Sequence, residues 1–301
     1  MPVKTMGHSY GQNSPRSIRL LAAVIAAAAG LLLGTPALLG GPYAPGVGQP
    51  GSTAIPAADP NLVLWASAVG EIRRGPQGIF DPEAYGYADF GLPANALGRA
   101  DVAISDEDQQ TFSVVSLGDG GSITLGFSAP FGNGPGADLA VFENSFSDTF
   151  LELAFVEVSS DGVHFTRFPS VSLTPLPQGG DDLSRDDFST IDPTNINNLA
   201  GKYRGGFGTP FDLSQLAGTA GLDINHIVAV RIVDVVGSSD PRWATHDSLG
   251  NIIKDPFPTV FPSGGFDLDA VGAYYPVLVP EPSSASLLLF GSAFFLHRRR
   301  R

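Results

Sequence analysis

Most side chains in this chain that could bind a metal ion or act in catalysis would do so through oxygen atoms. The sequence has no cysteine, but it has 30 Asp and Glu residues. Glu143 and Asn144 follow one apolar run, and Asp267 and Asp269 lie in another. Calcium binds through hard oxygen ligands and needs neither Cys nor His, so these four residues are candidate calcium ligands. No Asp-x-Asp-x-Asp-Gly loop is present, and the alternative is that they are solvated carboxylates or turn caps.

The same carboxylates could also serve glycoside hydrolysis, which needs one acid and one base or nucleophile. Glu143 with Asp267 or Asp269 would supply such a pair. The sequence contains no Gly-x-Ser-x-Gly elbow and no His-Glu-x-x-His helix. A carboxylate hydrolase therefore stays open as an alternative to a protein without catalytic activity.

A long polar segment between residues 176 and 210 is the best candidate for a binding surface. Connections of this length in a compact domain are usually functional or disordered. Its acidic cluster, Asp181 to Asp187, indicates a solvated loop. A second long loop covers residues 237–265. From these two loops we expect ligand contacts, with a glycan as the ligand class, from Asp192, Asn195, Asn197, Asn198, Lys202, Trp243 and His246.

Two other histidines carry little functional signal. His164 lies in a predicted hairpin and His226 begins a predicted strand. We expect both to be structural or surface residues, which leaves His246 as the histidine to test.

The elements that must position these residues are predicted to be β-strands. The stretch at residues 150–168 indicates a hairpin with a tight type I′ turn at Asp161-Gly162, because Asp-Gly supplies the positive φ angles of that turn. The apolar pattern of its first strand changes parity, so this strand is either buried on both faces or carries a bulge near Phe155.

Several further short strands are separated by Gly and Pro turns. One short helical turn is predicted at residues 211–217, with Asp212 as its N-cap. This pattern predicts an all-β fold, an antiparallel β-sandwich with long loops. The strands are expected at residues 61–68, 111–117, 122–127, 137–143, 226–236 and 266–274.

Both ends of the chain read as targeting segments. Residues 1–37 contain three basic residues and no acidic one. The apolar run Leu20 to Leu33 follows the basic residues, and the small residue Ala37 marks the expected cleavage site. This is typical of a cleaved signal peptide, predicted as a helix, with an uncleaved anchor as the alternative. Residues 38–60 are rich in Gly, Pro, Ala and Ser and predict a spacer before the folded body.

The folded body is strongly acidic. Residues 38–279 contain 29 acidic and 10 basic residues, a net charge near −19. Nucleic acid is therefore excluded as a partner, because phosphate binding needs a basic surface. The charge favours a cation or a neutral ligand.

Two stretches of the body resemble a known fold. Val156 to Phe165, VEVSSDGVHF, resembles the strand-turn-strand of discoidin-like, galactose-binding-type jelly rolls, and the strand FDLDAVGAY fits the same pattern. DLAVFENSF, DPTNINNLAGKY and GTPFDL also resemble a group of uncharacterised bacterial cell-surface proteins. The resemblance implies a jelly-roll body at residues 61–278 and brings no established activity, because such folds host many different binders.

The C-terminus, residues 279–301, resembles the PEP-CTERM sorting signal of Gram-negative bacteria. It has a Pro-Glu-Pro motif, a short apolar stretch expected to be helical, and a terminal Arg cluster, namely Pro280, Glu281, Pro282, Arg298, Arg299, Arg300 and Arg301. The resemblance implies export, transient membrane retention with the arginines on the cytoplasmic side, and processing by an exosortase. We expect an exported cell-surface or extracellular-matrix protein without enzymatic activity, which binds polysaccharide and structural calcium. A secreted hydrolase and a purely structural matrix component are the alternatives.

Overall fold

The computed structural model describes residues 40–102, 113–176 and 190–277. The predicted signal peptide, the acidic residues Asp181 to Asp187 and the predicted sorting segment lie outside the described residues. Within the three described ranges, no helix is long and apolar enough to cross a membrane.

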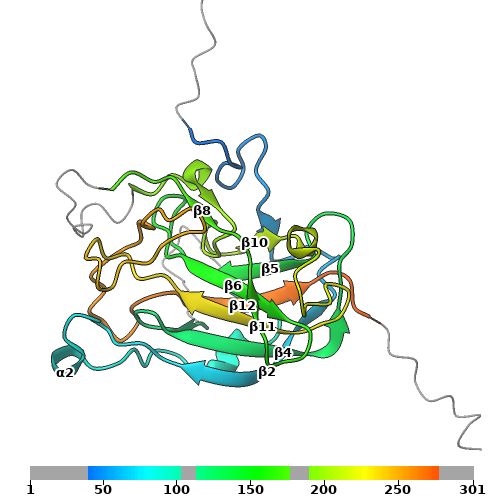
Figure 1. The fold of residues 1–301 in the computed structure, drawn as a ribbon, viewed down its shortest axis with the longest axis horizontal. Coiled ribbons are helices and arrows are strands. Elements are labelled where there is room, and N and C mark those ends of the chain that lie inside the picture. Colours follow the sequence, from blue (N-terminus) through cyan, green and yellow to red (C-terminus); the bar gives the residue numbers. More distant parts are fainter. Residues whose placement is uncertain (1–39, 103–112, 177–189, 278–301) are drawn as a thin grey trace, which may run out of the picture. The chain divides into compact units, whose positions relative to one another are not determined.

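The described chain is an antiparallel β-structure with few and short helical segments (Figure 1). The helical segments are α2 (Pro82–Tyr85), η1 (Pro93–Ala96), η3 (Pro193–Asn195) and η4 (Leu213–Leu216). The strands are β1 (Ile55–Pro56), β2 (Leu64–Arg73), β3 (Val115–Ser116), β4 (Ser122–Phe131), β5 (Leu139–Glu143), β6 (Ala154–Ser159), β7 (Thr166–Arg167), β8 (Val171–Ser172), β9 (Ile196–Asn197), β10 (Phe207–Phe211), β11 (Ile227–Asp234) and β12 (Asp267–Ala273). The prediction of an all-β antiparallel fold is confirmed.

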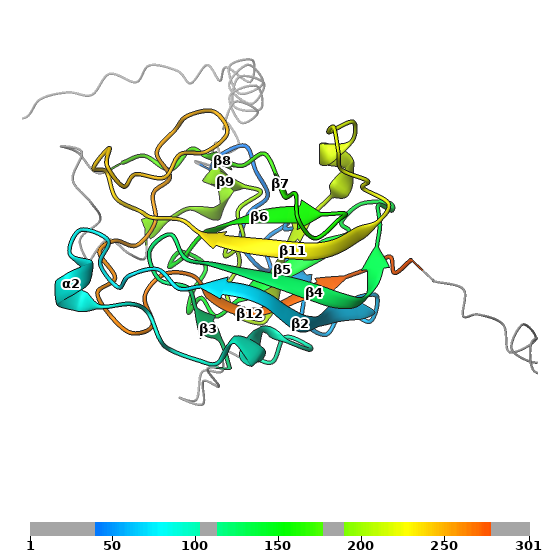
Figure 2. The ribbon, with the colours of Figure 1, turned by 60° about the horizontal axis from the view of Figure 1, so that its bottom comes forward.

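The main sheet curls into a sandwich-like arrangement of two layers. Its strand order is β1-β10-β5-β12-β2-β4-β11-β6-β7, with β3 paired to β12. Strand β2 joins the layers, because Leu64 and Trp65 pair with β12 whereas the residues from Ala66 onward pair with β4. The register of β2 against β4 shifts twice, and such bulges bend a strand. Figure 2 shows β2, β4, β11 and β6 as one layer.

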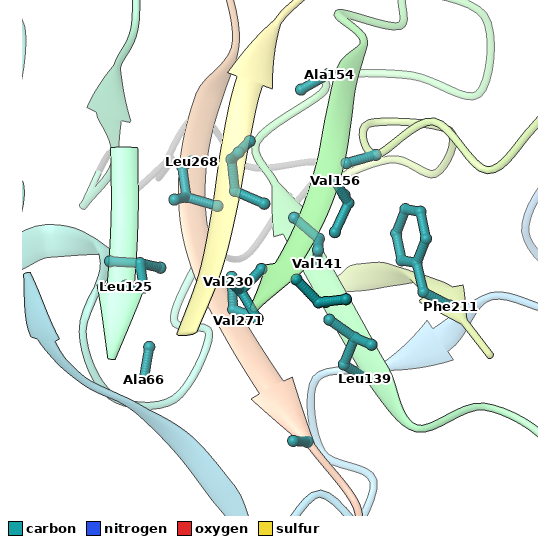
Figure 3. Close-up of a cluster of buried hydrophobic side chains, with 14 of the residues drawn as sticks. Ala66, Leu125, Leu139, Val141, Ala154, Val156, Phe211, Val230, Leu268 and Val271 are labelled. Carbon is teal, nitrogen blue, oxygen red and sulfur yellow. The ribbon is translucent and has the colours of Figure 1, made fainter. Parts of the chain in front are cut away.

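The core lies between the two layers. Leu139, Val141 and Val271 come from β5 and β12, and they belong to the same buried cluster as Leu125 and Val230 from the facing layer (Figure 3). All five side chains are essentially inaccessible to solvent. Burial of these apolar side chains supplies the main stabilising free energy of the fold.

The predicted hairpin forms, but its turn is wider than expected. Strands β6 and β7 pair at Glu157 and Arg167, and residues 160–165 separate them. The prediction of a two-residue type I′ turn is therefore wrong. The reason is local: Oδ1 of Asp161 accepts hydrogen bonds from the backbone N–H groups of Val163 and His164, both at 2.8 Å, which holds a larger turn together.

The parity change in this hairpin reflects burial on both faces. Val156 and Val158 belong to the main core, whereas Phe155 belongs to a second buried cluster with Leu151 and Leu153. The register of β6 against β11 is continuous, so this strand has no bulge near Phe155.

The described part of the expected spacer, residues 40–60, packs against the sandwich. β1 pairs with β10, and the backbone N–H groups of Gly41 and Tyr43 donate hydrogen bonds to Thr194. Gly and Pro carry little side-chain surface, but backbone donors in this segment still find partners. The packed body therefore extends toward the N-terminus beyond the predicted start at residue 61.

Candidate functional site

A hollow of about 440 Å³ opens beside β10 and is a candidate ligand pocket. It is lined by Thr53, Ile55, Gly136, Ala137, Asn197, Asn198, Lys202, Thr209, Pro210, Phe211, Asp212 and Gln215. This volume falls in the range of small-ligand sites, on the order of 300–1,000 Å³. The elements that build it are β1, β9, β10 and η4, which are distant in sequence.

Polar groups with spare hydrogen-bonding capacity line this pocket. Nζ of Lys202 donates to the carbonyl oxygen of Ile196 at 2.8 Å, which leaves two further donors of the ammonium group. The hydroxyl oxygen of Thr209 is buried and has no hydrogen-bond partner in the described part of the chain. Burial of Lys202 lowers its pKa to about 8, against the opposing influence of Asp192.

Two further side chains of the pocket lining, Asn198 and Asp212, are fixed by hydrogen bonds. The amide Nδ2 of Asn198 donates to the carbonyl oxygen of Pro169 at 2.8 Å and to Oε1 of Gln215 at 2.5 Å. Asp212 caps η4 by accepting a hydrogen bond from the N–H of Ser214 at 2.8 Å, as the sequence predicted. These contacts hold the polar rim in place before any ligand arrives.

A second hollow, of about 480 Å³, adjoins the first at Ile55 and Ala137. Its lining also contains Asn61, Val63, Pro135, Tyr274 and Tyr275. The two tyrosine rings have centroids 6.1 Å apart, and their hydroxyls are held by Asp59 and by the carbonyl oxygen of Pro135. We call the two hollows together the trough.

The trough is suited to recognition of a hydroxyl-rich ligand with an apolar face. The first hollow supplies amide, hydroxyl and ammonium groups, and the second supplies two tyrosine rings. Its lining includes one carboxylate, that of Asp212. A glycosidase of the usual kind uses two carboxyl groups.

The predicted ligand residues divide into three groups. Asn197, Asn198 and Lys202 line the pocket. The others lie elsewhere: Asp192 and Asn195 are the N-cap and the last residue of η3, and Trp243 and His246 lie in the 237–265 loop outside the trough linings. Trp243 is covered by the guanidinium of Arg242, at 4.2 Å from the ring centroid.

The structure adds trough residues that the sequence did not indicate. Thr209 precedes the predicted helical turn, Gln215 lies within it, and Tyr274 and Tyr275 follow the last strand. Two consecutive tyrosines directly after an apolar strand were the one sequence signal for this part of the trough. Ile55 and Ala137, which line the trough beside them, come close only through strand pairing.

The predicted metal ligands are largely brought together, away from the trough. Glu143 ends β5 and Asp267 begins β12, and these strands pair at this point. Nδ2 of Asn144 donates to Oδ2 of Asp267 at 3.3 Å. Asp269 differs, because its two oxygens accept hydrogen bonds from the N–H groups of Asp101 and Val102, both at 3.3 Å.

Burial changes the ionisation of these carboxyl groups. It raises the pKa of Glu143 well above its ordinary value, with a further rise from the negative charge of Asp267. It raises the pKa of Asp269 to about 7. As the side chains stand, no group of three or more His, Cys, Asp or Glu residues within the described ranges is placed to hold a metal ion.

The carboxylate pair expected for a hydrolase lies in this buried set. Glu143 is 1% exposed and Asp267 is 6% exposed, and neither lines the trough. His164 and His226 are both surface residues, as expected.

No protein-family model matches the chain, and a search of curated proteins found no match to it.

Proposed function

We propose that this protein is an exported, non-catalytic surface or extracellular-matrix protein that binds polysaccharide in the trough. The observation that supports this most is the junction at Ile55 and Ala137 of a polar pocket with a pair of tyrosine rings. Sugar rings offer hydroxyls for amide and ammonium groups and an apolar face for aromatic rings. The trough can therefore contact both the hydroxyls and the apolar face of one sugar ring.

The charge of the site narrows the ligand class. The trough has one basic side chain, Lys202, and one acidic side chain, Asp212. The body around it has a net charge near −19, from 29 acidic and 10 basic residues in 38–279. A strongly anionic polysaccharide would be repelled by this body, so a neutral polysaccharide is the proposed ligand.

The finer assignment of the fold and the cellular route belong to the same proposal. The two-layered antiparallel arrangement is compatible with a galactose-binding-like jelly roll. Residues 1–37 support export, and Pro280-Glu281-Pro282 with the terminal arginines supports membrane retention and exosortase processing. Mass spectrometry of the protein from the cell surface tests this route: a C-terminus near residue 280 is expected, and one still at Arg301 contradicts processing.

Glycan-array binding of the recombinant chain tests the binding function. We expect selective binding to neutral polysaccharides. Tyr275→Ala removes an aromatic ring of the trough and is expected to weaken binding by about tenfold or more, equivalent to about 1.4 kcal/mol. Asn197→Ala should weaken it as well. Trp243→Ala is the matched control, because this residue lies outside the trough linings, and it should leave the affinity unchanged.

The outcome of the array separates the alternatives. Binding that Tyr275→Ala and Asn197→Ala leave intact would contradict the trough as the site. No binding to any polysaccharide would contradict the proposal and favour a purely structural matrix component. Release of shorter saccharides from a bound polysaccharide would favour the hydrolase.

A further inference from the structure

A group of buried acidic side chains gathers at one end of the sandwich, separate from the trough. Glu143 ends β5, Asp234 ends β11 and Asp267 begins β12. Glu152 precedes β6, and Asp255 lies in the 237–265 loop. Each of the five is at least nine-tenths buried, with exposed fractions from 1% to 7%.

Hydrogen bonds divide these acids into two kinds. Asp234 accepts backbone N–H groups with both oxygens, from Phe266 at 2.7 Å and Gly120 at 2.8 Å, and Asp255 accepts the N–H of Leu153 at 2.6 Å. These two carboxylates hold connecting segments in place, which is a structural role that requires no ligand.

The remaining acids of this group are Glu143, Glu152 and Asp267. Oε2 of Glu143 accepts the N–H of Ser145 at 2.7 Å, but its Oε1 is buried without a partner in the described chain. Glu152 is 7% exposed, and the negative charges of Asp267 and Glu143 act on its carboxyl group. The two carboxyl oxygens of Asp267 accept hydrogen bonds from the side chains of Ser116 and Asn144.

Asn144 provides an independent observation that points to a ligand. This neutral side chain is 3% exposed, and its Oδ1 has no hydrogen-bond partner in the described chain. Its Nδ2 donates to Asp267 at 3.3 Å, so Oδ1 of the same amide lies beside that carboxylate. A buried carbonyl oxygen without a donor destabilises the fold unless a ligand or water satisfies it.

Negative charges act on one another within this group of acids. Burial, followed by the negative charges of Asp267 and Glu143, raises the pKa of Glu152 well above its ordinary value. The positive charge of Arg74 acts on Asp267 and partly offsets the rise in the pKa of that carboxyl. Its guanidinium is already engaged by the carbonyl oxygens of Phe90, Gly91 and Ser116.

We propose that Glu143, Glu152, Asp267 and Oδ1 of Asn144 bind a calcium ion. The donor set contains oxygen alone, which suits calcium rather than a transition metal. As they stand, no three acids in the described ranges are placed to hold a metal ion, so binding requires these side chains to move toward the ion. Compared with the sequence prediction, the site gains Glu152 and loses Asp269, whose oxygens are occupied by backbone donors.

The test is a calcium titration of the recombinant chain after treatment with EDTA, at pH 7.5, by calorimetry and thermal unfolding. We expect saturable binding of one calcium ion and a higher melting temperature. At pH 5, where protons compete for the carboxylates, the affinity should be at least tenfold lower. Absence of both heat and a melting shift at pH 7.5 would overturn the proposal and indicate that protons alone neutralise the cluster.

Variants assign the binding to this site. Glu143→Gln can keep the hydrogen bond from Ser145 through its amide oxygen, so it should fold. We expect Glu143→Gln and Glu152→Gln each to weaken calcium binding at least tenfold, whereas Glu83→Gln, an exposed charge-matched control on α2, should bind like wild type. Unchanged affinity in both cluster variants, or a stronger response to magnesium than to calcium, would overturn the assignment. Polysaccharide binding is measured separately, so either proposal can fail alone.

Discussion

Replacement of Asp119 by Asn tests how burial controls the ionisation of the acids at this end of the sandwich. Asp119 is 5% exposed, and its Oδ2 accepts the backbone N–H of Ile79 at 2.8 Å. Burial raises the pKa of this carboxyl from 3.8 to about 7, partly offset by the hydrogen bond from Ile79. An asparagine can accept the same hydrogen bond through its amide oxygen, so the variant removes the charge and keeps the contact.

The sign of the pH effect follows from proton linkage. The folded state holds the Asp119 proton more tightly than the unfolded state does. Its stabilising contribution is therefore complete below the unfolded pKa, near 3.8, and is lost as the pH rises through about 7. A pKa difference of about three corresponds to at most about 4 kcal/mol of unfolding free energy.

We expect Asp119→Asn to be similar to wild type at pH 4 and more stable at pH 8, by up to about 4 kcal/mol. Urea unfolding in EDTA, followed by the fluorescence of Trp65 and Trp243, measures this difference at each pH. Glu83→Gln should follow wild type throughout. A difference between Asp119→Asn and wild type that is equal at pH 4 and pH 8, or a variant that is less stable at pH 8, would refute the reasoning.

Three further predictions concern stability and the pocket. Gly201 has a φ of +79°, and a Cβ there would collide with the carbonyl oxygen of Glu152; Gly201→Ala should therefore lower the melting temperature far more than Gly250→Ala, whose Cβ would meet nothing within 4 Å. Leu125→Ala should reduce the unfolding free energy by about 2–5 kcal/mol in urea titrations, because it leaves a cavity in the core; a loss below about 1 kcal/mol would contradict the described packing. Asp138 accepts backbone N–H groups from two segments of the pocket rim, at 2.6 and 2.7 Å; Asp138→Asn should cost about 1–3 kcal/mol in the same titrations and weaken saccharide binding, and unchanged values of both would contradict this.

The core strands were predictable because their apolar residues recur with the period of a strand. The strand predicted at residues 226–236 corresponds to β11 at Ile227–Asp234. The strand predicted at residues 266–274 corresponds to β12 at Asp267–Ala273. The hairpin turn was not predictable from Asp-Gly alone, because the Asp161 side chain bonds to the backbone and stabilises a longer turn.

The trough was predictable only in part. Asn197, Asn198 and Lys202 could be found because they lie close together in one long polar segment. Tyr274 and Tyr275 could not be joined to them, since Ile55 and Ala137, which lie between the two hollows, are placed by the pairing of β1 with β10 and of β10 with β5.

The buried acids show a similar limit. Glu143 and Asp267 were noticed for their oxygen donors, whereas Glu152 lay inside a segment whose apolar pattern indicated core. The register of β12 against β5 shifts between Leu268 and Ala270, and Asp269 turns to the backbone of Asp101 and Val102. Neither a shift in register nor a backbone donor distant in sequence can be inferred from residue order.

The most direct test of the central claim is a crystal structure of the protein with an oligosaccharide that it binds on the array. The account predicts a sugar ring over Tyr274 or Tyr275, with hydroxyl contacts to Asn197 and Lys202. Saccharide bound elsewhere, for example beside Trp243 with the trough holding only solvent, would contradict it.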